Sequence, residues 1–195
     1  MKISILLPYK ENFSPIYPGA VSLFINDTCQ VSKYKKIITV YGSTEYREFF
    51  KIKYQNILLS KKIIQSQSRD YISKFIEFER KKSSDLIEIH NRPNYLKIIE
   101  KKLNKRNYTL FFHNDPLSMD GSKTIEDRKF LLKKCYRIIF NSEWSKKRFI
   151  EGLESKFVNS EKLNVFFQSA KKGNLNIIKD KKKWITFVGK LNKAK

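Results

Sequence analysis

Charged or hydrogen-bonding side chains lie at or just after the ends of short apolar segments of this 195-residue chain, and one glycine lies in the loop after the first such segment. They are Gly19, His90, Asn91, Arg92, His113, Asp115 and Ser142. A glycine at a helix start lets the backbone approach a phosphate, and a helix N-terminus favours an anion. Histidine and aspartate can hydrogen-bond and orient a hydroxyl group. If the fold brings these residues together, they could bind a phosphorylated ligand and position a hydroxyl.

Each of these residues also has a purely structural interpretation. Gly19 can serve only the turn before a helix, and a lone histidine at a strand end, such as His113, is often a satisfied polar residue. Asn91 can cap the helix that follows it, and Ser142 with Glu143 is typical of a helix start. The residues themselves leave both interpretations open.

The elements that would position these residues alternate between strand and helix. Short runs rich in β-branched and aromatic residues are the predicted strands: 2–7, 36–41, 56–59, 85–90, 109–113, 137–141, 163–167 and 184–188. Most of them are continuously apolar, which is typical of parallel strands that are buried on both faces.

Segments with helical spacing separate these runs. The predicted helices begin near Val21, Arg69, Pro93, Thr124 and Ser142, and the second places Ile72, Phe75, Ile76 and Glu79 on one side. Strand and helix in turn, with short connections, predict an α/β fold, a Rossmann-like doubly wound parallel sheet. In such a sheet ligands bind at the carboxyl ends of the strands, where the residues named first are found.

The composition changes once, in the lysine-rich stretch 171–183. Polar, charged stretches of this kind connect domains. We therefore expect one domain over 1–170, a linker over 171–183, and the truncated start of a second domain over 184–195. Because a single strand cannot close a core, we expect the natural gene product to be longer.

Segments in five places resemble, in order, motifs of glycosyltransferase family 4, which has the GT-B fold. They are Leu7-Pro8 with Pro18-Gly19-Ala20-Val21, then 85–93, 109–115, 135–144 and 185–195. The most specific is the last, which looks like the "F-V-G-R-L" start of that family's donor-binding domain. The resemblance covers essentially the whole chain and implies the N-terminal half of a GT-B fold. The chain departs from the pattern in having one glycine in the first loop and Lys190 where arginine is usual.

The resemblance implies a hexosyltransferase that moves a sugar from a nucleotide-sugar donor to a glycan or lipid-linked acceptor, in cell-surface polysaccharide or lipopolysaccharide biosynthesis. It implies that Gly19, Lys190 and Lys195 bind the donor phosphates and that the catalytic residue His113 contacts the donor sugar. With that activity, the candidate acceptor-binding residues are His90, Asn91, Arg92 and Asp115. No metal and no cofactor are expected, because the nucleotide sugar is a substrate. The fragment alone is expected to be inactive.

The net charge of +22 suits anionic partners such as nucleic acid, anionic lipid or phosphorylated molecules, but a general lysine bias explains it equally well. The basic residues are spread along the chain and no RRM, KH, helix-turn-helix or zinc motif occurs, so nucleic acid is not an expected partner. A nucleic-acid-binding domain or another Rossmann-type domain is the alternative function, although GxGxxG and P-loop motifs are absent.

The chain contains two cysteines and no CxxC motif, which argues against a zinc site or a disulfide framework. The apolar run at the amino terminus is too short for a signal peptide, and no run reaches the length of a membrane span. These observations predict a cytoplasmic protein. Basic and aromatic residues in 46–54 and 74–82 would suit peripheral contact with the anionic inner face of the membrane, or form an ordinary charged surface.

Overall fold

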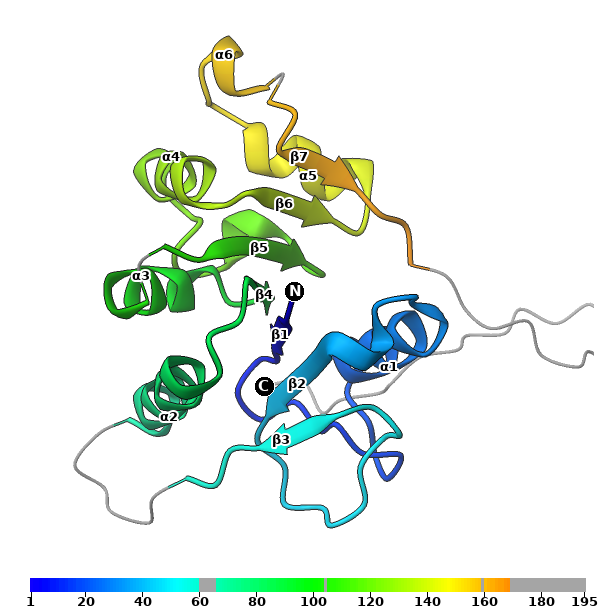
Figure 1. The fold of residues 1–195 in the computed structure, drawn as a ribbon. Coiled ribbons are helices and arrows are strands. Elements are labelled where there is room, and N and C mark those ends of the chain that lie inside the picture. Colours follow the sequence, from blue (N-terminus) through cyan, green and yellow to red (C-terminus); the bar gives the residue numbers. More distant parts are fainter. Residues whose placement is uncertain (60–65, 104, 159, 169–195) are drawn as a thin grey trace, which may run out of the picture.

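The computed structural model describes residues 1–59, 66–103, 105–158 and 160–168, and in them seven strands form one fully parallel sheet. The strands are β1 (Ile3–Leu6), β2 (Ile38–Gly42), β3 (Tyr54–Asn56), β4 (Leu86–His90), β5 (Asn107–Phe112), β6 (Arg137–Phe140) and β7 (Leu163–Val165). Their order is β3-β2-β1-β4-β5-β6-β7. The chain therefore starts in the middle of the sheet, runs to one edge, and returns past β1 to build the other half (Figure 1). This confirms the Rossmann-like doubly wound parallel sheet.

The predicted strands agree with the observed ones except at the edge strand β3. The sequence predicted a strand over 56–59, whereas β3 ends at Asn56 and Leu58 is 74% exposed. The apolar run continues beyond the carboxyl end of β3, so a prediction from hydrophobicity placed this strand too late in the chain. The predicted linker 171–183, the strand 184–188 and the start of a second domain lie outside the described residues.

The helices are α1 (Ala20–Val31), α2 (Gln67–Lys82), α3 (Pro93–Lys102), α4 (Ile125–Lys134), α5 (Glu143–Ile150) and α6 (Ser155–Val158), with the 3-10 helices η1 (Lys35–Ile37) and η2 (Pro116–Ser118). Serine and threonine side chains cap three of them, as their types predict. Thr124 accepts a hydrogen bond from the backbone N–H of Asp127 at 3.1 Å, and Ser142 accepts one from Ser145 at 3.1 Å. The helix starts at Thr124 and Ser142 are thus confirmed.

Two hydrophobic clusters cover the two faces of the sheet unequally. Helices α2, α3, α4 and α5 contribute to one cluster, which includes Phe75, Leu96, Leu131 and Phe149. Helix α1 forms the other with β1 and β2, and the fully buried ring of Phe13 joins it. Figure 1 shows α1 on one side of the sheet and α2, α3 and α4 on the other.

The predicted apolar side of α2 carries one acidic residue, Glu79, and it is fully buried. Its carboxylate accepts hydrogen bonds from the Ser4 hydroxyl at 2.5 Å and from the backbone N–H of Ser84 at 3.2 Å. Burying a carboxylate is tolerated only when it has such partners. Glu79 therefore links α2 to the start of the sheet, far from the carboxyl edge.

Candidate functional site

The backbone of His113 is fixed between the ends of the two neighbouring strands. The Asn91 side chain, after β4, accepts a hydrogen bond from the His113 N–H at 3.1 Å. The Asn141 side chain, after β6, donates one to the His113 carbonyl at 2.8 Å. Asn141 in turn accepts a hydrogen bond from the Ser145 hydroxyl at 2.9 Å. The predicted residues Asn91 and His113 are therefore brought together at the carboxyl edge of the sheet.

Aromatic side chains surround the His113 ring on the face that carries α1. The ring stacks on Phe111 with 4.6 Å between ring centroids and an interplanar angle of 15°. Phe24 of α1 contacts it edge-on at 5.1 Å. This burial is the main cause that lowers the pKa of His113 to about 3, and the neighbouring His90 lowers it further. His113 is therefore neutral near pH 7.

Hydrogen bonds connect His113 to three further polar side chains. His90 Nδ1 lies 2.9 Å from His113 Nε2, and His90 Nε2 lies 2.5 Å from a carboxylate oxygen of Glu88. On the other side, the amide nitrogen of Gln168 lies 2.7 Å from His113 Nδ1. Glu88 and Gln168 were not among the site residues predicted from the sequence. The signal for Glu88 was its spacing, since residues two apart on a strand share a face.

The prediction that His90 binds an acceptor directly needs correction. Its side chain has no solvent exposure, and both ring nitrogens are occupied by Glu88 and His113. The ring also stacks on Phe111 at 5.3 Å. His90 therefore contacts a ligand only through His113.

The N-terminus of α1 at Gly19 holds an anion that belongs to the chain itself. The Glu11 carboxylate accepts a hydrogen bond from the backbone N–H of Ser22, in the first turn of α1, at 3.0 Å. A Cβ on Gly19 would overlap the terminal atoms of Glu11, so a glycine is required for this approach. In this structure the helix start is occupied by the carboxylate of Glu11, and its binding of phosphate stays a prediction.

The structural interpretation of Asn91 as a helix cap was wrong. The N-cap of α3 is Arg92, without a side-chain cap, while the Asn91 side chain bonds to His113 instead. Asn91 has φ 55°, a left-handed conformation that asparagine tolerates better than most residues. Arg92 donates a hydrogen bond to the Asn91 carbonyl at 2.8 Å.

A small cavity of about 270 Å³ lies beside α3 and brings Asn91 and Arg92 together with Asp120 and Lys123. Asp115, the fourth acceptor candidate, does not line this cavity. Its side chain caps η2 by accepting a hydrogen bond from the Leu117 N–H at 3.0 Å and lies 3.4 Å from Arg148. Two of the four acceptor candidates therefore share one cavity.

A larger cavity of about 1300 Å³ lies at the carboxyl ends of β1, β2 and β3. Its polar wall is a hydrogen-bonded group in which Asn56 accepts from the Thr44 N–H at 3.0 Å and Thr44 Oγ1 donates to Asn12 at 3.1 Å. Tyr9 and Arg47 also line it. Most residues that line this cavity come from loops without a recognisable spacing, so the sequence did not predict it.

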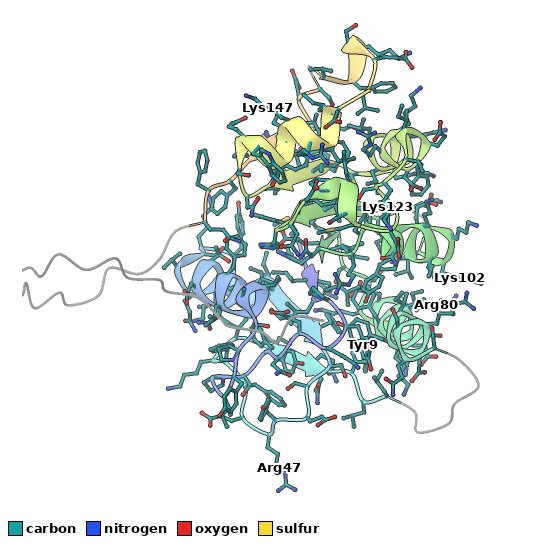
Figure 2. The ribbon with its side chains drawn as sticks, turned by 180° about the vertical axis from the view of Figure 1, so that it is seen from behind. Tyr9, Arg47, Arg80, Lys102, Lys123 and Lys147 are labelled. Atoms are coloured by element: carbon teal, nitrogen blue, oxygen red, sulfur yellow. The ribbon has the colours of Figure 1, made fainter. Side chains whose placement is uncertain are left out.

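Basic side chains are distributed over the surface, as their spread along the chain predicts. Figure 2 shows Arg47, Lys102 and Lys147 pointing away from different parts of the fold. Within the described ranges, no group of three or more histidine, cysteine or acidic side chains could hold a metal ion. No helix in the same ranges is long and apolar enough to cross a membrane. Lys190 and Lys195 lie outside the described residues.

No protein-family model and no curated protein sequence matches the chain. Solved structures do resemble it. Anabaena HepE in complex with UDP-glucose superposes with a TM-score of 0.59 at 15% sequence identity, over 87% of this chain and 44% of that chain. The same protein with UDP gives a TM-score of 0.59 at 17% identity.

A second similar structure is the UDP-N-acetylglucosamine 2-epimerase from Rickettsia bellii. It gives a TM-score of 0.51 at 14% identity, over 86% of this chain and 45% of that chain. The chain thus spans less than half the length of either of these two proteins. At these identities the likeness shows the fold, which is the Rossmann-like fold of one part of larger GT-B proteins.

Proposed function

We propose that this chain is the acceptor-side domain of a glycosyltransferase that uses a nucleotide-sugar donor. The observation that carries the proposal is the carboxyl edge of the sheet, where Phe24 of α1, Asn91 and the neutral ring of His113 lie together. In doubly wound sheets this edge is the ligand site. The similarity of the fold to a structure that was solved with UDP-glucose supports the same assignment.

Sugar transfer from a nucleotide diphosphate passes through an oxocarbenium-like transition state, while negative charge grows on the departing phosphate. Donors of hydrogen bonds aimed at that charge lower the barrier. We infer that the donor diphosphate replaces the Glu11 carboxylate at the Ser22 N–H, and that Gly19 leaves room for it. Lys190 and Lys195 are proposed to neutralise the same diphosphate. His113, being neutral, hydrogen-bonds the donor sugar without adding charge.

For the acceptor, the two cavities differ in capacity. The cavity beside Asn91 and Arg92 has about 270 Å³, which corresponds to about nine water molecules at ~30 Å³ each. The cavity lined by Tyr9 and Thr44 has about 1300 Å³ and is large enough for several sugar units. We propose that the acceptor glycan occupies the larger cavity and that Asn91 and Arg92 contact its end nearest the donor.

The function is tested with the protein expressed from the complete gene, a set of UDP-sugars and glycan or lipid-linked acceptors, with release of UDP as the measured quantity. His113→Ala should lower kcat by about 100-fold, the range for a positioned polar group in an active site. Lys147→Ala, on the outer surface of α5, is the matched control and should retain full activity. Near-normal turnover of His113→Ala in an otherwise active protein would contradict the assignment of His113.

The similarity to an epimerase favours one second candidate, a reaction on the nucleotide sugar alone. The two functions differ in their need for an acceptor. A transferase forms a new glycoside only when acceptor is added, whereas an epimerase converts UDP-N-acetylglucosamine into its isomer without one. NMR analysis of the products with and without acceptor separates the two functions.

We also propose that the acceptor belongs to a cell-surface polysaccharide or lipopolysaccharide pathway and that the protein contacts the cytoplasmic membrane face peripherally. The basic residues of 46–54 and of α2 would meet anionic headgroups. Co-sedimentation with liposomes that contain anionic lipid tests this contact. Absence of binding at low salt, with neutral liposomes as the reference, would exclude it.

A further inference from the structure

The two histidines of the chain, His90 and His113, lie in one hydrogen-bonded series that begins at Glu88. We propose that Glu88 and His90 are positioning residues that fix the proton of His113 on Nε2, so that Nδ1 is free to accept a hydrogen bond from a hydroxyl group of the donor sugar. The proton arrangement is inferred from the three hydrogen-bond distances with one proton on the His90 ring, while its use in sugar binding rests on the proposed function.

The series begins at the carboxylate of Glu88. An ionised carboxylate only accepts hydrogen bonds, so His90 Nε2, at 2.5 Å from it, must carry a proton. In a neutral His90 ring the other nitrogen, Nδ1, then has no proton and acts as an acceptor. Glu88 thereby sets the tautomer of His90.

The same logic passes from His90 to His113. Because His90 Nδ1 accepts, the Nε2 of His113 at 2.9 Å must donate. The Nδ1 of the neutral His113 ring is then the acceptor, and the amide nitrogen of Gln168 donates to it at 2.7 Å. All three hydrogen bonds have a donor and an acceptor in this arrangement, with the amide nitrogen of Gln168 facing His113. If His90 instead carried two protons, His113 would have to accept at Nε2 and donate from Nδ1.

The register of the sheet holds the series in place. His90 is paired with Phe111 across β4 and β5, and His113 follows two residues later on the same face. The Phe111 ring stacks on both histidine rings, at 5.3 Å from His90 and 4.6 Å from His113. Because His90 is fully buried, water does not compete for its two ring nitrogens.

Other titratable groups near Glu88 come from the segments packed on this face. Cys29 of α1 is buried, and its pKa is raised to about 12 by that burial and by the charge of Glu88. Lys35, which follows α1, acts on Cys29 in the opposite direction. A neutral thiol is at most a weak hydrogen-bond partner. Glu88, whose carboxylate lies 2.5 Å from His90 Nε2, is therefore the group that orients His90.

The exposed end of the series is the place where a ligand can bind. Gln168 is exposed, and its amide N–H presents to His113 Nδ1 the same kind of donor as a sugar hydroxyl. A ligand hydroxyl can replace Gln168 without any change of proton positions on either histidine. Fixing the acceptor nitrogen in advance lowers the reorganisation needed when the donor binds.

The proton arrangement is measured directly by NMR of the untagged chain labelled with ¹⁵N-histidine. Two imidazole groups are present, and long-range ¹H–¹⁵N correlation distinguishes Nε2-protonated, Nδ1-protonated and doubly protonated rings. We expect both rings to be neutral and protonated on Nε2 at pH 7. His90→Phe preserves the ring stacking and assigns the remaining signal to His113.

Glu88→Gln is the decisive variant because it keeps size and replaces the carboxylate by an amide that can donate as well as accept. We expect the single tautomer of His113 to become a mixture. In the protein from the complete gene, we expect kcat to fall about 10- to 100-fold, as when the partner that orients a ligating histidine is removed. His90→Asn, which keeps an acceptor for His113, should retain more activity than His90→Phe. Glu77→Gln, an exposed residue of α2, is the control for loss of one charge.

A wild-type His113 protonated on Nδ1, or an unchanged His113 tautomer in both Glu88→Gln and Glu88→Ala, would overturn the proposal. A kcat that is equal in His90→Asn and His90→Phe would overturn the positioning role in the reaction. Failure of the proposed function has a different signature, since the NMR result would hold while the wild-type protein transfers no sugar.

Discussion

The contact between Gly19 and Glu11 leads to a prediction that stability measurements can test. Gly19 has φ −76° and ψ 159°, a conformation that alanine adopts without strain. A Cβ at this position would nevertheless overlap the carboxyl group of Glu11. Gly19→Ala must therefore expel the Glu11 carboxylate from the first turn of α1.

The expected magnitude follows from the interactions that are lost. The hydrogen bond from the Ser22 N–H to Glu11, at 3.0 Å, has a charged acceptor and contributes about 1.5–3 kcal/mol. The negative charge of Glu11 in the first turn of α1 contributes a further stabilisation of about 0.3–1 kcal/mol. Water replaces part of this bond, because Glu11 is partly exposed, and alanine stabilises by about 0.4–1 kcal/mol through the unfolded chain. We expect Gly19→Ala to lower the free energy of unfolding by about 1–2 kcal/mol.

Glu11→Ala removes the same contact without any overlap and should cost a similar amount. Because both changes break one interaction, the double variant should lose no more stability than Glu11→Ala, and the alanine at position 19 should make it about 0.4–1 kcal/mol more stable than Glu11→Ala. Urea denaturation of the four proteins, followed by circular dichroism, measures this coupling. Glu11→Gln keeps a hydrogen-bond acceptor without the charge and should lose less.

Additive losses in the double variant would refute the reasoning, because they would mean that Gly19 and Glu11 stabilise the protein independently. A Gly19→Ala protein as stable as the wild type would refute it as well, since the carboxylate would then have room beside a side chain at this position.

Three further outcomes are expected. Gly121→Ala should lower the free energy of unfolding by about 2–4 kcal/mol in the same urea assay. Gly121 has φ +92°, and a Cβ would lie 2.5 Å from the backbone nitrogen of Asn94. A smaller loss than for Gly19→Ala would contradict this prediction. Burial raises the pKa of both Cys29 and Cys135 to about 12, so neither thiol should react with a disulfide reagent at pH 8 until urea unfolds the chain. The pKa of His113 is about 3 in the folded protein and near 6.5 in the unfolded chain, so between these values only the unfolded chain protonates this side chain. The free energy of unfolding therefore falls as the pH drops from 6.5 toward 3. His113→Gln should flatten this dependence between pH 6.5 and 5.

The sequence predicted the fold well because a parallel sheet covered on both faces needs continuous apolar strands. Continuous apolar runs therefore located β1, β4, β5 and β6 within one or two residues. It failed at β3, where the apolar Leu58 follows the strand but faces solvent. Apolar residues are buried only on average, and an edge strand, which has a neighbour on one side alone, constrains the position of its residues least.

The site was predictable to the extent that it depends on strand ends. That rule placed Asn91 and His113 at one edge, where the structure finds them in contact. It could not predict Glu11, since a loop that folds back across the helix start has no periodic signal. The rule also assigned His90 to ligand contact because strand position alone does not reveal which side chain another covers.

The two asparagines that hold His113 have opposite chemical requirements although they are the same residue. The Asn91 side chain accepts from the His113 N–H, and an aspartate would make the same bond at this left-handed backbone but would bury a charge, because Asn91 is only 6% exposed. Asn141 must donate to the His113 carbonyl and accept from Ser145 at once. An aspartate at 141 would place a carboxylate oxygen against the carbonyl oxygen of His113 and remove the hydrogen bond that fixes the end of β5. The single amide nitrogen of Asn141 therefore determines where the carboxyl end of β5 points.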